Sequence, residues 1–463
     1  MDGETLCSRK SKFGDMIPKN QMVASYGNIM EDNSSSPLDE DIFQHSKQLE
    51  RARRDLQRIQ ESVTYRLGQH ITDAVRSKWK IPFLPISFPI AIFLLGLEKI
   101  GLRPHPKTER DYGEYVPENV VLLFPTNGVG FGHFTRMYGL ARNIKKQDPE
   151  AEVIFFTPMP TLHIPYLDNF PTYHVAGKYK FQEMSSTVWN GIIEEQLLMI
   201  IELHKPKAFV FDGAYPYRGM LNAISGYPNL RKYWMKRGMI KKGSNIPIDS
   251  IEFFDCILHP GDAVEASSDA EYNSMQIPPI TLIEEEEMLS KEAARNRLSL
   301  PQDSVVWYLQ LGAGQINDID SEISMTVDSI LEHDAQNFIV LGESMLGERI
   351  AISDPRVKIL RDYPNGIYFK AFDYSVQAGG YNSFHEMRRA SMPTIFYPNM
   401  NTGMDDQLSR CKLGEHEGWG IVVEKRTKKA IVHAVQNVTD LVPKPVNDNQ
   451  SNSESHWVKS ILT

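Results

Sequence analysis

The order of apolar strand, glycine-rich turn and helix occurs twice in this chain and restricts its fold more than any other sequence feature. The apolar run at residues 120–125 precedes the glycine-rich residues 126–133 and a helical pattern of apolar residues. The apolar run at residues 305–311 precedes Gly312, Ala313 and Gly314. Uniformly apolar strands are typical of parallel sheets that helices cover on both faces. The sequence therefore predicts an α/β protein with two doubly wound domains.

Further short apolar runs continue this alternation. A helix is expected at residues 188–204, and strands are expected at residues 153–156, 208–211, 256–258, 338–341, 357–360, 374–377 and 394–397. Four consecutive acids at residues 284–287 favour an exposed, extended connection because like charges repel. We therefore expect an N-terminal domain at residues 116–287 and a C-terminal domain at residues 288–440.

The two ends of the chain lack this pattern. Residues 1–40 contain three consecutive serines, Ser34, Ser35 and Ser36, followed by Pro37, and they show no apolar period, which predicts a mobile tail. Residues 441–463 are rich in Pro, Asn and Ser and are interpreted as a second mobile tail. Residues 41–115 are expected to form a helical extension before the first domain.

A narrow apolar stripe marks the first part of this extension. Its residues recur in steps of three and four, at Leu49, Ala52, Leu56, Ile59 and Val63. This spacing places them on one side of a helix. Such a helix, over residues 42–67, either pairs with a second copy as a short coiled coil or packs on its own chain, and the sequence leaves both alternatives open.

Residues 81–97 are apolar throughout and form the second part of the extension. A spanning helix needs about 20 apolar residues, and each proline removes a backbone donor from a helix. The prolines here are Pro82, Pro85 and Pro89, and the flanking basic residues are Lys78, Lys80, Lys99 and Arg103. We expect the segment to lie in a membrane interface with the basic side chains on lipid headgroups. The alternative is an apolar arm packed across the fold.

Charge and cysteine content exclude several classes of protein. The chain of 463 residues has 50 Lys and Arg against 59 Asp and Glu, a net charge of −9, which is unfavourable for nucleic-acid binding. Cys7, Cys256 and Cys411 lie far apart and form no CxxC pair, so neither a zinc knuckle nor a redox motif is expected. The polar N-terminus lacks the apolar core of a signal peptide. We expect a cytoplasmic protein, peripheral on the inner face of the plasma membrane if residues 81–97 contact lipid.

The first glycine-rich turn contains Gly128, Gly130 and Gly132 and ends in His133. Glycines allow a backbone to approach a ligand closely, and the following helix directs its amide hydrogens at the same place. The G-x-G-x-G-H spacing and the Thr157 after the next strand both differ from a nicotinamide-cofactor site, which needs G-x-G-x-x-G and an acid. His133 is a candidate general base because imidazole titrates near neutral pH. The alternative is a histidine that only braces the turn.

A second group of candidate residues follows the strand at 374–377. Gly379, Gly380, Asn382 and Ser383 open a helix there, and small residues at a helix start offer amide donors to phosphate. Glu386 lies farther along the same helix. Its carboxylate can accept two hydroxyl hydrogens, as from a ribose diol. The alternative is an ordinary solvated glutamate.

A third group, Asp405, Asp406 and Gln407, follows the last predicted strand. Open α/β sheets bind ligands at this edge, so these acids and the amide are candidates for contacts with sugar hydroxyls. Aspartate is also favoured as a helix N-cap, and the sequence leaves that alternative open.

Together these three stretches resemble the GT-B glycosyltransferases. The closest resemblance is to the family 28-like branch that includes the undecaprenyl-muramoyl-pentapeptide N-acetylglucosaminyltransferase of peptidoglycan synthesis. Residues 128–133 are similar to the N-terminal glycine loop of that branch. Residues 379–386, Pro393, Pro398 and residues 405–407 are similar to its C-terminal donor signature. The resemblance covers about residues 118–425 and implies two Rossmann-like domains facing a cleft, with the helical extension outside it.

The resemblance implies a nucleotide-sugar donor, usually UDP-linked, on the C-terminal domain. Glu386 would hold the ribose, and Asp405, Asp406 and Gln407 would touch the transferred sugar. Asn382 belongs to the same donor site. The diphosphate of the donor would lie against Gly312, Ala313, Gly314, Gly379, Gly380 and Ser383. The acceptor would lie against Gly128, Gly130, Phe131 and Gly132, with His133 near the reacting hydroxyl and oriented by Asp212.

The same resemblance implies that no cofactor and no bound metal is needed, and that the UDP-sugar is a co-substrate. The sequence Asp318-Ile319-Asp320 matches a D-x-D motif but lies at an expected helix start, where capping explains it better. The family loop often has Thr or Ser between its glycines, whereas this chain has Val129 and Phe131. This difference favours a glycan or lipid-linked acceptor other than the peptidoglycan lipid.

The expected function is therefore an inverting glycosyl transfer in cell-envelope or polysaccharide synthesis. A nucleotide-sugar 2-epimerase and a nucleotide-sugar-binding protein without turnover are the alternatives. The basic residues around Trp234, namely Arg231, Lys232, Lys236, Arg237, Lys241 and Lys242, are a candidate surface for an anionic acceptor or anionic lipid. The alternative for that stretch is a solvated helix face.

Overall fold

The computed structural model describes residue 59 and residues 62–99, 115–126, 131–177, 184–236, 248–262, 273–312, 319–343, 350–401, 405–443 and 454–462. The chain divides into two compact units, Met1–Thr108 and Glu109–Thr463. The predicted tail at 1–40 lies outside the described residues, as does the predicted self-association helix at 42–67 except for Ile59 and residues 62–67.

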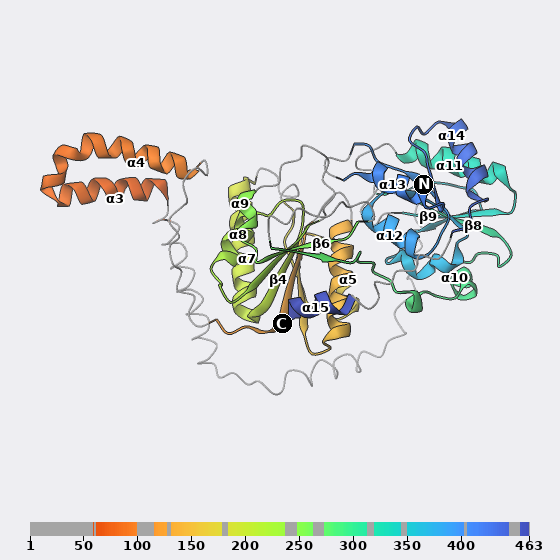
Figure 1. Cartoon of the computed structure of the whole chain (residues 1–463), viewed down its shortest axis with the longest axis horizontal. Helices are drawn as coiled ribbons and strands as arrows, with labels where there is room; N and C mark the ends of the chain where they lie inside the picture. Colours follow the sequence, from red (N-terminus) through yellow and green to blue (C-terminus); the bar gives the residue numbers. More distant parts are fainter. Residues whose placement is uncertain are drawn as a thin grey trace, which may run out of the picture. The chain divides into compact units, whose positions relative to one another are not determined.

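The first unit contains a helical hairpin (Figure 1). Its elements are α3 (Val63–Arg76), the 3₁₀ helix η1 (Lys78–Phe83) and α4 (Leu84–Lys99). The Arg66 guanidinium forms an ion pair with Glu98 at 2.6 Å, and the His70 ring lies 3.0 Å from the Ser87 hydroxyl. These two contacts hold α3 along α4, so the described part of the predicted extension is helical.

The prolines of this segment do not interrupt α4 as the sequence predicted. Pro82 lies in η1, and Pro85 lies in the first turn of α4, where amides lack an acceptor within the helix in any case. Only Pro89 lies in the interior of the helix. Among the described residues, one helical stretch of 20 residues, Trp79–Glu98, is long and apolar enough to cross a membrane.

The N-terminal half of the second unit is a parallel sheet of seven strands in the order β3-β2-β1-β4-β5-β6-β7. The strands are β1 (Glu118–Pro125), β2 (Glu152–Thr157), β3 (Thr172–His174), β4 (Pro206–Asp212), β5 (Arg231–Met235), β6 (Cys256–Pro260) and β7 (Ser274–Ile277). The chain order reverses between β1 and β4, whose register pairs Pro125 with Asp212. Ligands of open α/β sheets bind at the carboxyl ends of the strands at such a reversal.

Helices cover both faces of this sheet, as the uniformly apolar strands require (Figure 1). They are α5 (Gly132–Gln147), α6 (His163–Leu167), α7 (Ser186–His204), α8 (Arg218–Ser225) and α9 (Ile248–Ile251). Val121 and Leu123 pack toward α5, and Leu122 and Phe124 pack on the opposite face toward α7 and α8. The alternation along β1 therefore divides the domain into two cores.

The C-terminal half repeats this architecture with six parallel strands in the order β10-β9-β8-β11-β12-β13. The strands are β8 (Val305–Gln310), β9 (Asn337–Gly342), β10 (Val357–Leu360), β11 (Tyr374–Ala378), β12 (Thr394–Tyr397) and β13 (Gly420–Val422). The helices are α10 (Lys291–Arg297), α11 (Ile319–His333), η4 (Asn365–Ala371), α12 (Tyr381–Arg389), α13 (Gln407–His416) and α14 (Lys428–Val438). Here the order reverses between β8 and β11, so the predicted pair of doubly wound domains is confirmed.

The end of the chain differs from the prediction of a mobile tail at residues 441–463. Residues Glu454–Leu462 form helix α15, which packs beside α5 on the N-terminal domain (Figure 1). Trp457, Val458 and Ile461 are buried in the core cluster that also contains Val121 and Leu123. The tail prediction is wrong here because three apolar residues at helical spacing lie within a polar stretch and cover one face of the sheet.

The basic stretch around Trp234 is described at residues 231–236 only, and this part is not a helix face. Its described part is mostly β5, and the Lys232 side chain is 7% exposed and donates to the carbonyls of Tyr227 and Leu230. Arg237, Lys241 and Lys242 lie outside the described residues. The alternative of a solvated helix face is therefore wrong for residues 231–236, whereas a contact of the stretch with an anionic acceptor or lipid stays a prediction.

The acidic run at residues 284–287 lies between the two sheets but is not extended. It contains the 3₁₀ helix η3 (Glu285–Glu287), with a reciprocal cap between Glu284 and Glu287. Arg142 of the N-terminal domain pairs with Glu287, and Arg389 of the C-terminal domain pairs with Glu284. Opposite charges from both domains thus offset the repulsion within the run.

Candidate functional site

His133 and Asp212 meet at the carboxyl edge of the N-terminal sheet. His133 lies in the first turn of α5, just after β1, and Asp212 is the last residue of β4. The Nδ1 atom of His133 lies 2.6 Å from Oδ1 of Asp212. Asp212 is 1% exposed. The reversal of strand order between β1 and β4 brings the two residues together, so the expected contact between them is present.

Arg136 completes this group, and the sequence analysis missed it. Its Nε and Nη2 atoms donate to the two carboxylate oxygens of Asp212 at 3.0 and 2.8 Å. Burial would raise the pKa of Asp212, but the charges and hydrogen bonds of Arg136 and His133 outweigh burial and lower it. The sequence feature that could have identified Arg136 is its position three residues after His133, which places both side chains on one face of the helix.

The protonation pattern follows from these contacts. Nδ1 of His133 lies next to the ionised Asp212 carboxylate, which can only accept a hydrogen bond, so Nδ1 carries the hydrogen between them. Arg136 Nη2 also lies 2.9 Å from Nδ1, but a guanidinium only donates, and this nitrogen donates to Asp212 instead. This leaves Nε2 as the ring nitrogen that can take up a proton.

The glycine turn before α5 is described only at its end. Gly128 and Gly130 lie outside the described residues. A Cβ on Gly132 would meet nothing within 4 Å, and its carbonyl accepts a hydrogen bond from Asn382 Nδ2 at 3.2 Å. Phe131 stacks on Tyr363 of the C-terminal domain, with ring centroids 5.2 Å apart. Two of the predicted acceptor-site residues therefore contact the other domain.

The predicted donor residues gather at the corresponding reversal in the C-terminal sheet. Gly312 follows β8 and has a φ of +93°, which favours glycine, whereas Ala313 and Gly314 lie outside the described residues. Gly379 follows β11, and a Cβ there would lie 2.4 Å from the Cys411 sulfur. Gly380 is the N-cap of α12. The first turn of α12 is thereby placed at the carboxyl edge of this sheet.

Two residues of the first turn of α12 are half-buried, and one of them has an unsatisfied atom. Asn382 and Ser383 both lie in this turn. The side-chain oxygen of Asn382 is buried and accepts no hydrogen bond from the described residues. An acceptor of this kind is costly to bury without a donor, so it suits a ligand hydroxyl or a water.

Glu386 is half-buried rather than fully exposed to solvent. Burial raises the pKa of its carboxyl group to about 7. Its charge in turn raises the pKa of the Tyr308 and Tyr363 hydroxyls, after the larger effect of burial on each. The side chain is half-buried, so the alternative of an ordinary solvated glutamate does not hold.

The third predicted group is largely occupied by its own helix. Asp406 is the N-cap of α13 and accepts a hydrogen bond from the Ser409 amide at 3.1 Å, so the capping alternative holds for it. Asp405 forms an ion pair with Arg410 at 2.8 Å. The buried amide oxygen of Gln407 accepts from the Asn399 amide at 2.9 Å. A contact of these residues with sugar remains a prediction.

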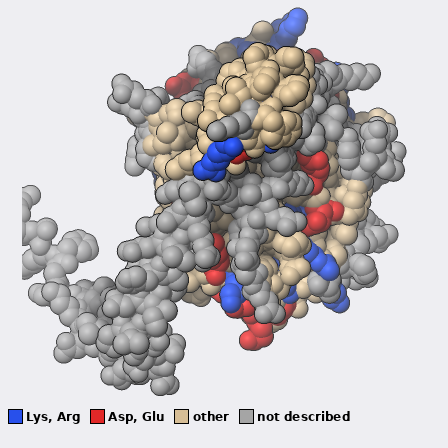
Figure 2. Space-filling view, turned by 90° about the vertical axis from the view of Figure 1, so that its left-hand side faces the viewer, with Lys and Arg blue, Asp and Glu red and all other residues tan. Residues whose placement is uncertain are grey.

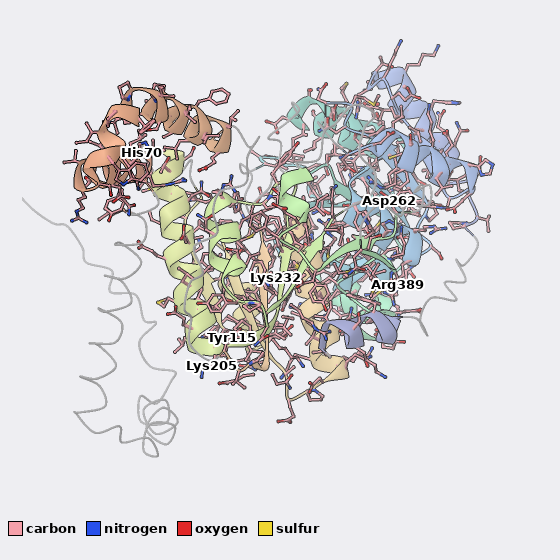
Figure 3. The ribbon with its side chains drawn as sticks, turned by 60° about the vertical axis from the view of Figure 1, so that its left-hand side comes forward. His70, Tyr115, Lys205, Lys232, Asp262 and Arg389 are labelled. Atoms are coloured by element: carbon pink, nitrogen blue, oxygen red, sulfur yellow. The ribbon has the colours of Figure 1, made fainter. Side chains whose placement is uncertain are left out.

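A buried polar cluster joins the two domains, and no sequence motif indicated it; Figure 3 labels one of its members, Asp262. Arg410 on α13 pairs with Asp262, which follows β6, and both side chains are 0% exposed. Tyr381, the first residue of α12, donates to the Gly261 carbonyl at 2.8 Å. The guanidinium carbons of Arg136 and Arg410 lie 5.4 and 5.8 Å from the centre of the Tyr381 ring. Because Arg136 belongs to the His133 group, the two cations near the Tyr381 ring connect this cluster to that group.

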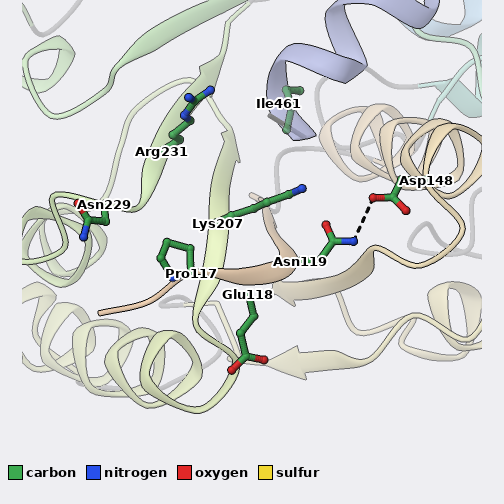
Figure 4. A pocket seen from close by; sticks show the side chains of 8 residues that line it. All are labelled: Pro117, Glu118, Asn119, Asp148, Lys207, Asn229, Arg231 and Ile461. Carbon is green, nitrogen blue, oxygen red and sulfur yellow. Dashed lines mark hydrogen bonds between the residues drawn. The ribbon is translucent and has the colours of Figure 1, made fainter. Parts of the chain in front are cut away.

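A cavity of about 600 Å³ lies at the opposite edge of the N-terminal sheet (Figure 4). It is lined at the amino ends of β1, β4 and β5 by residues including Glu118, Lys207 and Arg231. Of its lining residues, Arg231 belongs to the basic stretch around Trp234, and none belongs to the predicted donor residues or to the His133 group. Within the described ranges, no three His, Cys, Asp or Glu residues lie close enough to hold a metal ion.

Comparison with known proteins supports the fold assignment. No protein-family model and no curated protein matches this chain. Solved structures do match, including the spinosyn forosaminyltransferase SpnP, with a TM-score of 0.50 and 13% identity over 74% of this chain and 93% of that chain. The fold is GT-B. The UDP-GlcNAc 2-epimerase of Methanocaldococcus jannaschii matches equally, with a TM-score of 0.50 and 14% identity over 74% of this chain and 99% of that chain.

A third similar structure is MurG of Acinetobacter baumannii, with a TM-score of 0.48 and 13% identity over 74% of this chain and 99% of that chain. Identities this low establish the fold alone. The two matches with a TM-score of 0.50 are a transferase and an epimerase, so the fold alone does not distinguish these reactions.

Proposed function

We propose that this protein is a glycosyltransferase that moves a sugar from a nucleotide-sugar to a hydroxyl group of an acceptor. One observation carries this proposal. The His133 imidazole is held by a buried carboxylate at the reversal point of the N-terminal sheet, and the carbonyl of the adjacent Gly132 contacts Asn382 on α12 of the C-terminal domain. The residue proposed as base and the helix start proposed to bind the diphosphate thus lie on the two sides of one junction.

The proposed chemistry begins at the Nε2 atom of His133. This nitrogen takes the proton of the acceptor hydroxyl, and the oxygen attacks the anomeric carbon as the bond to the nucleotide diphosphate breaks. The ionised Asp212 stabilises the imidazolium that forms, and Arg136 keeps Asp212 ionised. A single displacement of this kind inverts the anomeric centre.

The C-terminal domain would bind the donor. The amide hydrogens at the start of α12 and the backbone at Gly312 would meet the charge that grows on the leaving diphosphate. Glu386, with a pKa of about 7, would accept hydrogen bonds from the ribose hydroxyls in its ionised form. We expect a UDP-linked hexose or N-acetylhexosamine as donor and a reaction that proceeds without metal, which a chelator would leave unchanged.

The acceptor is proposed to be a glycan or a lipid-linked carrier, as in cell-envelope or polysaccharide synthesis. Phe131 supports an acceptor other than the peptidoglycan lipid because its ring is packed on Tyr363 where the family loop often has a hydroxyl residue. The expected site of action is the cytoplasmic side of a membrane.

The deciding experiment incubates the protein with several nucleotide-sugars, with and without candidate acceptors. Release of free nucleoside diphosphate that depends on an acceptor supports transfer. Conversion of the donor into a second nucleotide-sugar without acceptor would instead identify an epimerase, the other activity found on this fold. Tight binding without either product would identify a protein that has lost turnover and would contradict the proposal.

A further inference from the structure

We propose that the helical hairpin at residues 62–99 is an anchor that lies flat in the surface of an anionic lipid bilayer, with α4 facing the lipid and α3 facing water. This proposal concerns the first unit alone and does not depend on the reaction of the second unit.

The outer face of α4 is apolar and exposed to solvent. Between Ile81 and residue 97 the chain has no charged residue, although 24% of its residues are charged overall. Ile86 is 66% exposed, Ile90 is 52% exposed and Phe93 is 63% exposed. Only 6% of the apolar stretch Trp79–Glu98 is buried. Figure 2 looks onto the turn end of the hairpin, and most of the hairpin surface seen there is tan, the colour of residues other than Lys, Arg, Asp and Glu. An apolar surface of this extent indicates a partner that removes it from water.

The inner face of α4 shows why the hairpin lies along the bilayer rather than through it. Glu98 is 4% exposed and pairs with Arg66 on α3, and Ser87 contacts His70 one turn farther along α3. A spanning α4 would therefore carry Arg66, His70 and Asp73 of α3 into the hydrocarbon, where charged and polar groups are costly. An α4 parallel to the surface leaves these groups in water.

The prolines of α4 support the same orientation. Pro89 has no amide hydrogen, so the carbonyl of Pro85 lacks its partner in the helix. Both prolines are exposed. An unpaired carbonyl is unfavourable in hydrocarbon but can accept from water or a headgroup at the interface.

The turn of the hairpin carries groups that suit anionic headgroups. Trp79 is 70% exposed, and the Lys80 ammonium lies 5.6 Å from the centre of its ring. Arg76 is exposed at the end of α3. Tryptophan and basic side chains concentrate at the lipid–water boundary. These groups therefore favour a bilayer surface over a second copy of the chain as the partner of the hairpin.

The first test measures sedimentation of the full-length protein with vesicles of phosphatidylcholine, with and without phosphatidylglycerol. We expect binding that increases with the anionic lipid. The double variant Ile90→Glu, Phe93→Glu should weaken binding at least about 10-fold because it places two charges on the lipid-facing side. The matched control is Leu203→Glu, which adds a charge at a residue 53% exposed on α7 and should bind as the unchanged protein does.

The second test determines orientation with a membrane-impermeant thiol reagent added outside the vesicles. In a Cys7→Ser background, Cys256 and Cys411 are buried, so single cysteines at Thr64 and Lys80 report on the two ends of the hairpin. Labelling of both sites on vesicle-bound protein is expected. Protection of Lys80→Cys alone would show a spanning helix and overturn the proposal. Failure to bind vesicles, equal binding by the double variant, or a lipid-independent dimer that the double variant disrupts would overturn it as well.

Discussion

Arg410 and Asp262 form an ion pair in which neither side chain is exposed, although they come from different domains. Arg410 Nε lies 2.9 Å from Oδ2 of Asp262, and Nη1 donates to the Gly379 carbonyl at 2.8 Å. The pair therefore fixes the turn between β11 and α12 to the end of β6. Because Gly379 belongs to the predicted donor site, the contact between the domains and the shape of that site are linked.

Replacing Asp262 by Asn should destabilise the protein strongly. The Arg410 guanidinium would remain buried but would keep only one of its two carboxylate partners, Asp405. Loss of a buried charge partner costs about 3–5 kcal/mol. The comparison variant is Glu332→Gln, which removes an exposed ion pair with Lys428 and should cost less than about 1 kcal/mol. Denaturant unfolding of both variants measures the difference, and equal midpoints would contradict the importance of the buried pair.

The same pair predicts how stability depends on pH. Burial would raise the pKa of Asp262, but the His385 ring at 3.6 Å and the hydrogen bonds and charge of Arg410 outweigh burial and lower the pKa below its ordinary value. The stabilisation is therefore complete above the unfolded-state pKa, about 4, and is lost as the pH falls below it. The difference between the unchanged protein and Asp262→Asn should shrink in that range, whereas a difference independent of pH would refute the assignment.

Replacing His133 by Ala should remove the proposed base. We expect kcat to fall at least about 100-fold with little change in donor affinity, because the donor would bind the other domain. His433→Ala, on the outer face of α14, provides the control and should leave kcat unchanged. Turnover and donor titration on the same preparations test this, and an active His133→Ala protein would exclude the base role.

Glu386 should make donor binding depend on pH. With a pKa near 7, its carboxylate fraction rises roughly tenfold between about pH 6 and pH 8, and affinity for a nucleotide-sugar should rise with it. Glu386→Gln should weaken binding by about 1–3 kcal/mol at the higher pH and abolish the pH dependence. Isothermal titration with an intact nucleotide-sugar measures both effects. A Gln variant with the same pH profile would show that another group titrates.

Trp457 should contribute to the stability of the N-terminal domain although it lies near the end of the chain. Trp457→Ala would leave a cavity in the core beneath α15 and should cost about 3–5 kcal/mol. Lys459→Ala alters an exposed residue of the same helix and should cost less than about 0.5 kcal/mol. Thermal unfolding of the two variants is the measurement, and equal melting temperatures would show that α15 is dispensable.

The strands that could be predicted from the sequence are those whose own residues are apolar throughout. Residues 120–125 and 394–397 are examples, and the structure has β1 and β12 there. Strand β5 was missed because it begins with Arg231 and Lys232, and only the tertiary structure supplies the carbonyls that the buried Lys232 requires. Strands β3 and β13, with three residues each, are too short to show a period.

The part of the candidate site that could be predicted is the part whose residues follow neighbouring strands of one sheet. His133 lies at the start of the helix that follows β1, and Asp212 ends the neighbouring strand β4, so their proximity follows from the topology. Arg410 and Asp262 are 148 residues apart, and neither belongs to a motif. Their pairing depends on how two domains pack, and local patterns contain no information about that.

Helix α15 also determines how the domains are tethered. The chain leaves the N-terminal domain after β7, forms the whole C-terminal domain and returns to the first domain to place Trp457 in its core. The polypeptide therefore crosses the boundary twice. Any opening of the domains for substrate and product exchange is therefore constrained by two covalent connections rather than one.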